Sequence, residues 1–173
     1  MKITLFLVLQ LSCLMYRLIE SPYTTALSPL AIATGCDSIP ELNQGIIDFV
    51  TPKIKKKVGR GECWDLANEA LLSIDAKWNG KYVFGRLVDD KTECVFPGDI
   101  IQMESLKTVK KEGNRTDIQE FPHHTAIIYE VKGPGKYVLA HQNTEFTGKK
   151  VGLSELDLAY VVKGHFKIYR PVR

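Results

Sequence analysis

Apolar side chains recur at mostly four-residue steps over residues 42–58, which predicts amphipathic helix in this part of the chain. Pro52 falls inside the pattern, and a proline interrupts helical hydrogen bonding, so we expect either one kinked helix or two short ones. Glycines at positions 59 and 61 end the pattern. Residues 63–74 then place their apolar side chains on one face, which predicts a second helix that begins at Cys63.

The second half of the chain consists of short apolar runs separated by turn residues, which is typical of an antiparallel sheet. The predicted strands are residues 99–103, 125–131, 137–142 and 165–169. Residues 132–135 predict a turn between the second and third strands, and the lysine-rich residues 106–116 predict an exposed loop. Helices followed by strands predict an α+β domain, with N-terminal helices packed on one face of an antiparallel β-sheet.

The N-terminal residues carry a positive charge at Lys2 and then an apolar stretch, which is the pattern of a secretory signal peptide. Polar residues interrupt the stretch too early for a membrane span. We therefore expect residues 1–26 to be a signal peptide, residues 27–40 an extended lead and residues 41–173 a single domain. An uncleaved anchor is the alternative. The expected location is secreted or periplasmic, with no stable membrane insertion after the signal is removed.

Composition is that of an ordinary globular protein, at 45% hydrophobic and 25% charged residues. A formal net charge of +3 without a long basic block indicates a weakly basic surface, so we expect no nucleic-acid partner. The short basic cluster of Lys53, Lys55, Lys56 and Lys57 is interpreted as the solvated face of a helix. The sequence does not indicate an oligomeric state.

Four cysteines are present, and Cys13 would leave with the signal peptide. An odd number then remains, which suggests one free thiol and two cysteines that pair. If Cys63 is the free, reactive thiol, Cys36 and Cys94 are the candidates for a disulfide.

Cys63 begins a predicted helix, where unpaired backbone N–H groups favour the thiolate, which is the nucleophilic form of cysteine. A cysteine hydrolase also needs a histidine base and a polar group that fixes the imidazole tautomer. His124 begins one predicted strand, and His141 and Asn143 end the next, so strand pairing would bring these side chains together. The pattern predicts Cys63 as nucleophile, His124 as general base, and either His141 or Asn143 as the group that orients His124.

One residue close in sequence to each proposed catalytic residue could take part in the chemistry: His123 beside His124, and Asp65 after Cys63. His123 is the rival base, but successive side chains of a strand point to opposite faces, and His124 shares its face with the apolar Ala126 and Ile128. Asp65 is interpreted as a first-turn charge favoured by the helix dipole rather than as a catalytic acid.

A zinc site built from Cys63, His124 and His141 is a third reading of the same residues. The paired ligand spacing of common zinc sites is absent, so we expect no metal and no cofactor. Large aromatic residues near the second helix are expected in the core rather than in a substrate groove. They are Trp64, Trp78, Tyr82 and Phe84.

Four segments resemble, in the same order, segments of the CHAP and NlpC/P60 cysteine peptidases. Residues 61–67 (Gly-Glu-Cys-Trp-Asp-Leu-Ala) are similar to their nucleophile segment, and residues 97–101 (Pro-Gly-Asp-Ile-Ile) to a strand entry. Residues 124–128 (His-Thr-Ala-Ile-Ile) resemble the strand of their catalytic histidine. Residues 139–143 (Leu-Ala-His-Gln-Asn) stand where their next strand often ends in Glu-Gln-Asn. The resemblance implies a papain-like core.

The resemblance also implies an activity, that of a cysteine peptidase or amidase acting through a thioacyl-enzyme. Its substrates would be peptides or peptidoglycan-derived peptides. His141 stands where CHAP domains commonly carry glutamate, and is more similar to the Cys-His-His arrangement of NlpC/P60 enzymes. A similar domain ends some fungal cytoskeletal adaptor proteins, so a binding or scaffold module without turnover is the alternative. Acyl transfer to or from lipids is another.

Overall fold

A computed structural model describes residues 36–173 of the chain. The predicted signal peptide and most of the predicted lead lie outside these residues. The helices and strands follow one another as α1 Glu41–Val50, η1 Thr51–Lys53, α2 Cys63–Leu72, β1 Arg86–Val88, β2 Ile100–Glu112, β3 Arg115–Gly133, β4 Lys136–His141, β5 Gly152–Asp157, η2 Leu158–Tyr160 and β6 Val161–Arg170. Within residues 36–173, no helix is both long and apolar enough to cross a bilayer.

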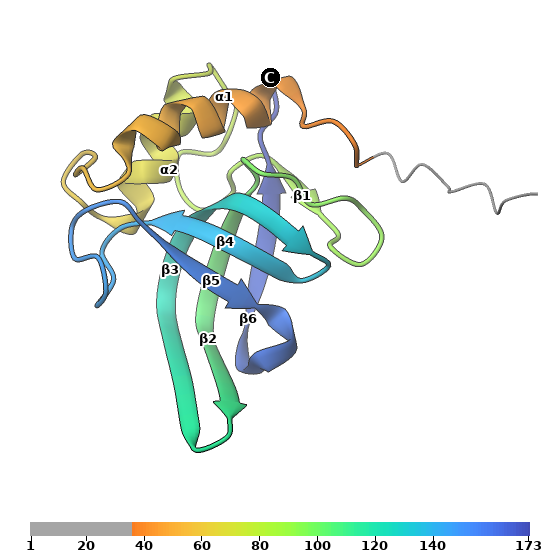
Figure 1. The fold of residues 1–173 in the computed structure, drawn as a ribbon. Coiled ribbons are helices and arrows are strands. Elements are labelled where there is room, and N and C mark those ends of the chain that lie inside the picture. The colour runs from red at the N-terminus through yellow and green to blue at the C-terminus, as the bar shows by residue number, and fades with distance from the viewer. Residues whose placement is uncertain (1–35) are drawn as a thin grey trace, which may run out of the picture. The chain divides into compact units, whose positions relative to one another are not determined.

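The six strands form one antiparallel sheet in the order β1-β6-β2-β3-β4-β5 (Figure 1). One hydrophobic cluster lies between α1, α2 and one face of the sheet, and a second gathers the side chains of the other face. The predicted α+β class, with N-terminal helices packed on an antiparallel sheet, is confirmed.

The first helix is shorter than its apolar pattern. The pattern over residues 42–58 predicts one kinked helix or two short ones, but α1 ends at Val50, and only the short 3-10 turn that contains Pro52 follows it. Lys55 has a φ of 66°, which a helix does not allow. Residues 55–57 therefore belong to a loop, and the interpretation of the lysine cluster as a helix face is wrong.

The largest correction concerns residues 106–116, which were expected to form a loop. They are the ends of two long paired strands, β2 and β3, whose register runs from Ile100 opposite Ile127 to Glu112 opposite Arg115. This hairpin projects beyond the rest of the sheet (Figure 1), so most of its outer residues are polar and exposed. A solvated ribbon lacks the apolar alternation by which strands are predicted, which explains the error.

The two edge strands, β1 and β5, have no counterpart in the predicted pattern. Each buries only one residue fully, Val88 in β1 and Leu156 in β5, so neither carries a clear apolar periodicity. The strands predicted around residues 125–131, 137–142 and 165–169 coincide with parts of β3, β4 and β6. The predicted turn at residues 132–135 joins β3 to β4, as expected.

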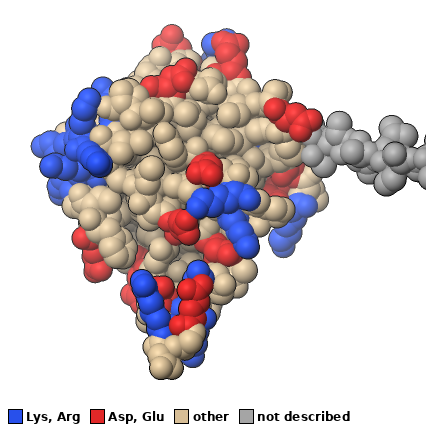
Figure 2. Space-filling view, viewed as in Figure 1, with Lys and Arg blue, Asp and Glu red and all other residues tan. Residues whose placement is uncertain are grey.

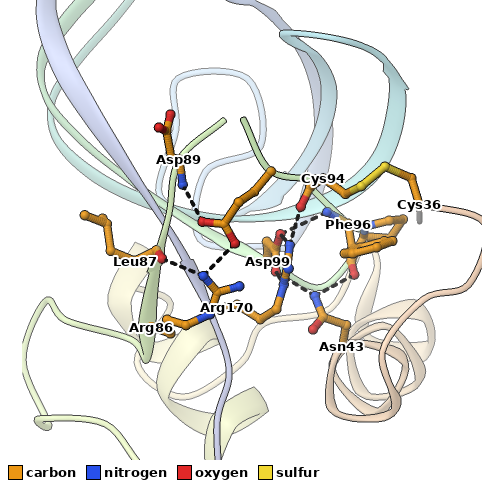
Figure 3. Close-up of polar contacts among 11 residues, drawn as sticks. Cys36, Asn43, Arg86, Leu87, Asp89, Cys94, Phe96, Asp99 and Arg170 are labelled. Carbon is orange, nitrogen blue, oxygen red and sulfur yellow. Dashed lines mark hydrogen bonds and ion pairs between the residues drawn. A yellow bond between two sulfur atoms is a disulfide. The ribbon is translucent and has the colours of Figure 1, made fainter. Parts of the chain in front are cut away.

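Cys36 and Cys94 form a disulfide, with their Cα atoms 5.6 Å apart. Cys63 is the free cysteine of the described residues. The bridge joins the segment before α1 to the segment before β2 (Figure 3). The disulfide predicted for the case in which Cys63 is the free thiol is therefore the one that the structure contains.

A buried ionic cluster lies beside this disulfide (Figure 3). The fully buried Asp99 accepts hydrogen bonds from Asn43 Nδ2 at 2.8 Å and from the Phe96 N–H at 2.9 Å. Arg170 donates to the same carboxylate from Nε at 3.0 Å and from Nη2 at 2.7 Å. Gly98 is required here, because a Cβ at its φ of 86° would lie 2.3 Å from the Asn43 carbonyl oxygen. The cluster ties α1 to β2 and β6.

Three of the four aromatic residues near α2 pack in or against the core, as expected. Phe84 is fully buried, and the Trp78 ring stacks on it at 5.5 Å and contacts the Trp64 ring at 5.6 Å. Tyr82 differs, because it is 43% exposed and its ring meets the His123 ring edge-on at 4.4 Å. The core expectation is wrong for this tyrosine.

Candidate active site

A cleft of about 590 Å³ opens at the start of α2. Its lining comes from the start of α2, from β3 and from the loop after β4. Residues that line it include Cys63, Ile118, Phe121, His123, His124 and Phe146. The fold therefore brings the predicted nucleophile and both candidate bases to one surface, although they lie about 60 residues apart in sequence.

The start of α2 is fixed by Asp65, which lies in the first turn of the helix. Its carboxylate accepts the N–H groups of Arg60 at 2.7 Å and Glu62 at 3.2 Å, and pairs with the Arg60 guanidinium at 2.8 Å. Burial raises the pKa of Asp65, but the hydrogen bonds from Arg60 and Glu62 outweigh it and hold that pKa below its ordinary value. Asp65 is thus occupied in positioning the turn that carries Cys63.

Gln142 is a buried residue for which sequence reasoning predicted no role. Its Oε1 accepts the Val58 N–H at 3.2 Å, and its Nε2 donates to the carbonyl oxygens of Val58 at 2.9 Å and Glu62 at 2.8 Å. Two of these bonds tie the residue after β4 to Val58, and the third ties it to Glu62, the residue immediately before Cys63. The available signal was its position between His141 and Asn143, two residues already singled out.

A hydrogen-bonded chain runs away from the cleft through two buried histidines to the half-buried Ser154. His124 Nε2 lies 3.0 Å from His141 Nδ1, and His141 Nε2 lies 2.9 Å from Ser154 Oγ. His124 is 6% exposed and His141 is 1% exposed, so neither histidine competes with much solvent along this chain. The Phe121 ring packs 5.4 Å from the His124 ring. Sequence reasoning missed Ser154, because β5 gave no strand signal.

The direction of the chain decides what His124 offers to the cleft. If His124 Nε2–H donates to His141 Nδ1, then His141 Nε2–H donates to the Ser154 hydroxyl, and His124 Nδ1 is an unprotonated acceptor. If the Ser154 hydroxyl donates instead, both bonds reverse and Nδ1 carries the proton. Only the first arrangement makes His124 a base toward a thiol.

Both histidines of the chain are neutral near pH 7. Burial, reinforced by the charge of His123, lowers the pKa of His124 to about 4. Burial, followed by the charge of His124, lowers the pKa of His141 to about 3. A neutral pair satisfies the tautomer requirement, since the bond between the two imidazoles needs one protonated and one bare nitrogen.

The two neighbouring histidines have separate environments. His123 is exposed, and its Nδ1 lies 2.8 Å from Glu104 Oε2 on the adjacent strand. His124 is buried beside Phe121 and shares its face of β3 with Ala126, as expected. It lies inside β3 rather than at the start of a strand, because that strand begins at Arg115.

Among the described residues, no hydrogen bond joins Asn143 to His124. The expectation that Asn143 ends the same strand as His141 is wrong, because β4 ends at His141 and Asn143 has a left-handed φ of 63°. Its Nδ2 instead donates to Glu62 Oε2 at 2.7 Å. Of the two candidate orienting residues, the structure brings His141 to His124 and places Asn143 at the turn before Cys63.

Residues 40–173 match the family model of the AIM3/BBC1 cysteine proteinase-fold domain. The chain belongs to this family. It is also 31% identical to altered inheritance of mitochondria protein 3 from Debaryomyces hansenii, in an alignment that covers 69% of this chain. The chain spans about 15% of the length of that curated relative.

Two solved structures of Ly7917 are similar to this AIM3/BBC1 domain. The structure of Ly7917 with the hydrolyzing product of MDP is 17% identical, with a TM-score of 0.48 over 75% of this chain and 62% of that one. The structure of Ly7917 alone is 16% identical, with a TM-score of 0.45 over 73% and 62%. The family match shows a cysteine-proteinase-like fold, and it does not single out NlpC/P60 or CHAP domains.

Two further observations describe the chemistry available in this domain. In the described part of the chain, no hydrogen bond joins Cys63 Sγ to an imidazole nitrogen. Nor do residues 36–173 contain a group of three or more histidine, cysteine, aspartate or glutamate side chains arranged to hold a metal ion.

Proposed function

We propose that this AIM3/BBC1 domain is a cysteine hydrolase that cleaves amide bonds through a thioacyl-enzyme. The observation that carries the proposal is the chain from Ser154 through His141 to His124, which ends in the cleft that Cys63 lines. Cys63 is the proposed nucleophile and His124 the proposed general base. His141 is the proposed orienting residue, because it occupies Nε2 of His124 and leaves Nδ1 for the thiol.

The proposed reaction begins when His124 Nδ1 takes the thiol proton and Cys63 Sγ attacks the carbonyl carbon of the substrate. The Cys63 N–H lies among the first N–H groups of α2, which have no partner within the helix, and it suits the oxyanion. The His124 imidazolium then protonates the leaving amine, and the carbon–nitrogen bond breaks to give a thioester. Water hydrolyses the thioester, with His124 again acting as the base.

Burial of His124 affects how this proton moves. The imidazolium is disfavoured in isolation, since burial lowers its pKa to about 4. A neighbouring thiolate or oxyanion would stabilise the positive charge, so protonation of His124 is expected to occur together with formation of that anion.

The walls of the cleft suit a peptide with a bulky apolar side chain. Ile118 is 50% exposed and Phe146 is 74% exposed, although burial of such side chains is worth roughly 1.5–3 kcal/mol each. Both line the cleft that contains Cys63. We therefore propose peptides with a large apolar residue as the first substrates to assay, with peptidoglycan-derived peptides as the second class.

The deciding experiment compares Cys63→Ala with the wild-type protein on a peptide library read by mass spectrometry. Turnover should fall at least about 10³-fold in the variant. The free energy of unfolding should change by no more than about 2 kcal/mol, because one small, half-buried group is lost. Undiminished hydrolysis by a folded Cys63→Ala protein would refute the nucleophile assignment.

A binding module without turnover is the second candidate. Two observations favour it: the thiol of Cys63 has no imidazole hydrogen bond, and the matching relative is a much longer protein. Alkylation separates the candidates. With iodoacetamide at pH 7, the hydrolase predicts fast modification of Cys63 that His124→Ala slows, whereas a binding module predicts slow modification that His124→Ala leaves unchanged.

We also propose that the domain matures in an oxidising compartment. The disulfide between Cys36 and Cys94 supports this location, because disulfides persist mainly where thiols are not kept reduced. Mass spectrometry of the protein isolated from its own cells, alkylated before reduction, should find both cysteines paired. Complete alkylation of both would contradict the proposal.

A further inference from the structure

A basic surface forms where two distant segments meet beside α2. Ile54 and Val151 form a parallel bridge, the Lys55 N–H donates to the Val151 carbonyl at 2.7 Å, and the Val151 N–H donates to the Lys56 carbonyl at 2.8 Å. These bonds bring the loop after η1 against the segment before β5. The basic surface consists of Lys53, Lys55, Lys56, Lys57, Lys149 and Lys150. Figure 2 shows blue side chains gathered on the side where the loop after α1 lies in Figure 1.

Most of these ammonium groups have no acidic partner among the residues that the structure describes. Lys149 pairs with Glu62, and Lys53 lies over the Phe49 ring at 5.2 Å. Lys55, Lys56, Lys57 and Lys150 take part in none of the ion pairs of residues 36–173.

The projecting hairpin shows a different arrangement, because most of its cations pair with carboxylates of the same hairpin. Lys107 pairs with Glu120 and Lys110 with Glu112, each at 2.6 Å. The whole chain has a net charge of only +3, so the basic surface is a local concentration and not a reflection of overall composition. Like charges held together repel, and an anionic partner would relieve that repulsion.

The surrounding carboxylates indicate which kind of anion fits. Glu62 lies next to Lys149, and Glu145 lines the cleft on the same loop that carries Lys149 and Lys150. A nucleic-acid strand presents a phosphate at every step and would meet these carboxylates. A peptide can place its own carboxylates opposite the lysines alone.

We propose that this basic surface binds an acidic segment of a protein, a role separate from the proposed hydrolysis. Position supports a peptide as the occupant. The Lys149 side chain packs against Gly61, where an added Cβ would lie 2.8 Å from Lys149 Cβ, so the surface borders the turn that precedes Cys63. An extended peptide can therefore lie on the lysines and continue toward the cleft.

The test measures binding of a fluorescein-labelled hexaglutamate to the full chain by anisotropy, at 50 mM and 500 mM salt. The variant Lys55→Gln/Lys56→Gln/Lys57→Gln should bind about 10-fold more weakly at low salt, if each surface charge contributes about 0.5 kcal/mol. The matched control is Lys77→Gln/Lys163→Gln/Lys167→Gln, which removes three exposed lysines from other surfaces. It should change the affinity less than 2-fold, and high salt should weaken wild-type binding.

Three outcomes would overturn the proposal. One is equal weakening by the test and control variants, since that would indicate an effect of net charge alone. Another is no binding of hexaglutamate, or equal binding of hexaglutamine. The last is tighter binding of a single-stranded oligonucleotide or of phosphatidylserine vesicles, which would assign the surface to a different partner. Because no readout depends on turnover, a failed hydrolase assay leaves the result intact.

Discussion

Two buried polar clusters occupy the same sheet, and their chemistry is opposite. Around Asp99, a carboxylate receives four hydrogen bonds, two of them from Arg170 (Figure 3). Around His124, the chain through His141 to Ser154 consists of groups that are uncharged near pH 7. The first cluster neutralises a buried charge, and the second avoids one.

The difference in charge and hydrogen bonding indicates that the Asp99 cluster connects elements of the fold, whereas the His124 chain suits a reactive role. Each oxygen of the Asp99 carboxylate accepts two hydrogen bonds from the protein. This cluster can therefore hold α1, β2 and β6 together, and it leaves no carboxylate oxygen free to bind a substrate. At the other end of the histidine chain, His124 lines the open cleft, and its Nδ1 takes part in no hydrogen bond among residues 36–173. The Pro-Gly-Asp segment that resembled an enzyme motif is therefore architectural in this domain, whereas the histidine segment is the one that suits chemistry.

The largest effect on stability is expected from Arg170→Met, which leaves the buried Asp99 carboxylate without its cation. Unfolding in urea should show a loss of about 3–5 kcal/mol, because one partner of a buried ion pair is removed. The matched control is Arg173→Met, whose pair with Glu41 is exposed and should be worth less than about 1 kcal/mol. Similar losses in both variants would show that the Asp99 cluster is not a special connection.

The histidine chain should make stability fall as the solution becomes acidic. Above pH 6.5 both histidines are neutral in the folded and unfolded protein, so they contribute no pH dependence. Below pH 6.5 the unfolded chain binds protons first, since burial lowers the folded pKa values to about 4 for His124 and about 3 for His141.

The loss should amount to roughly 3 kcal/mol for each histidine between pH 7 and pH 4, so to roughly 6 kcal/mol for the pair, measured by urea unfolding across this range. His141→Asn removes one of the two groups and should make the dependence shallower. A variant with the same slope as the wild type would show that the buried pair does not control acid stability.

A smaller effect should distinguish the two candidate orienting residues. His141→Ala is expected to lower kcat about 10–100-fold, more than Asn143→Ala and less than His124→Ala, because His141 contacts the base and Asn143 contacts Glu62. Ser154→Ala should fall between the wild type and His141→Ala. All variants are assayed on one substrate, with folding checked by circular dichroism. If Asn143→Ala is more damaging than His141→Ala, the orienting role belongs to the asparagine.

Local patterns in the sequence predicted a large part of the fold and of the site. Glycines before Cys63 and an apolar face after it defined the start of α2, since helix periodicity and termination depend on residues a few positions apart. The turn between β3 and β4 is equally local, and a hairpin brings neighbouring strands together without further information. That is why the proximity of His124 and His141 could be predicted.

Tertiary structure decided the features that depend on distant or solvated segments. Ser154 meets His141 only through the pairing of β4 with β5, an edge strand with one fully buried residue. Asn143 has a left-handed backbone conformation and donates to Glu62 instead of His124, and a strand pattern in the sequence does not reveal such a conformation. The basic surface gains Lys149 and Lys150 because the bridge between Ile54 and Val151 brings their segment beside the lysines that follow η1.

Sequence by itself determined where α2 begins and where the turn between β3 and β4 lies, because those depend on local periodicity and on turn residues. Their final partners depended on packing between segments far apart in the chain, which local periodicity does not encode.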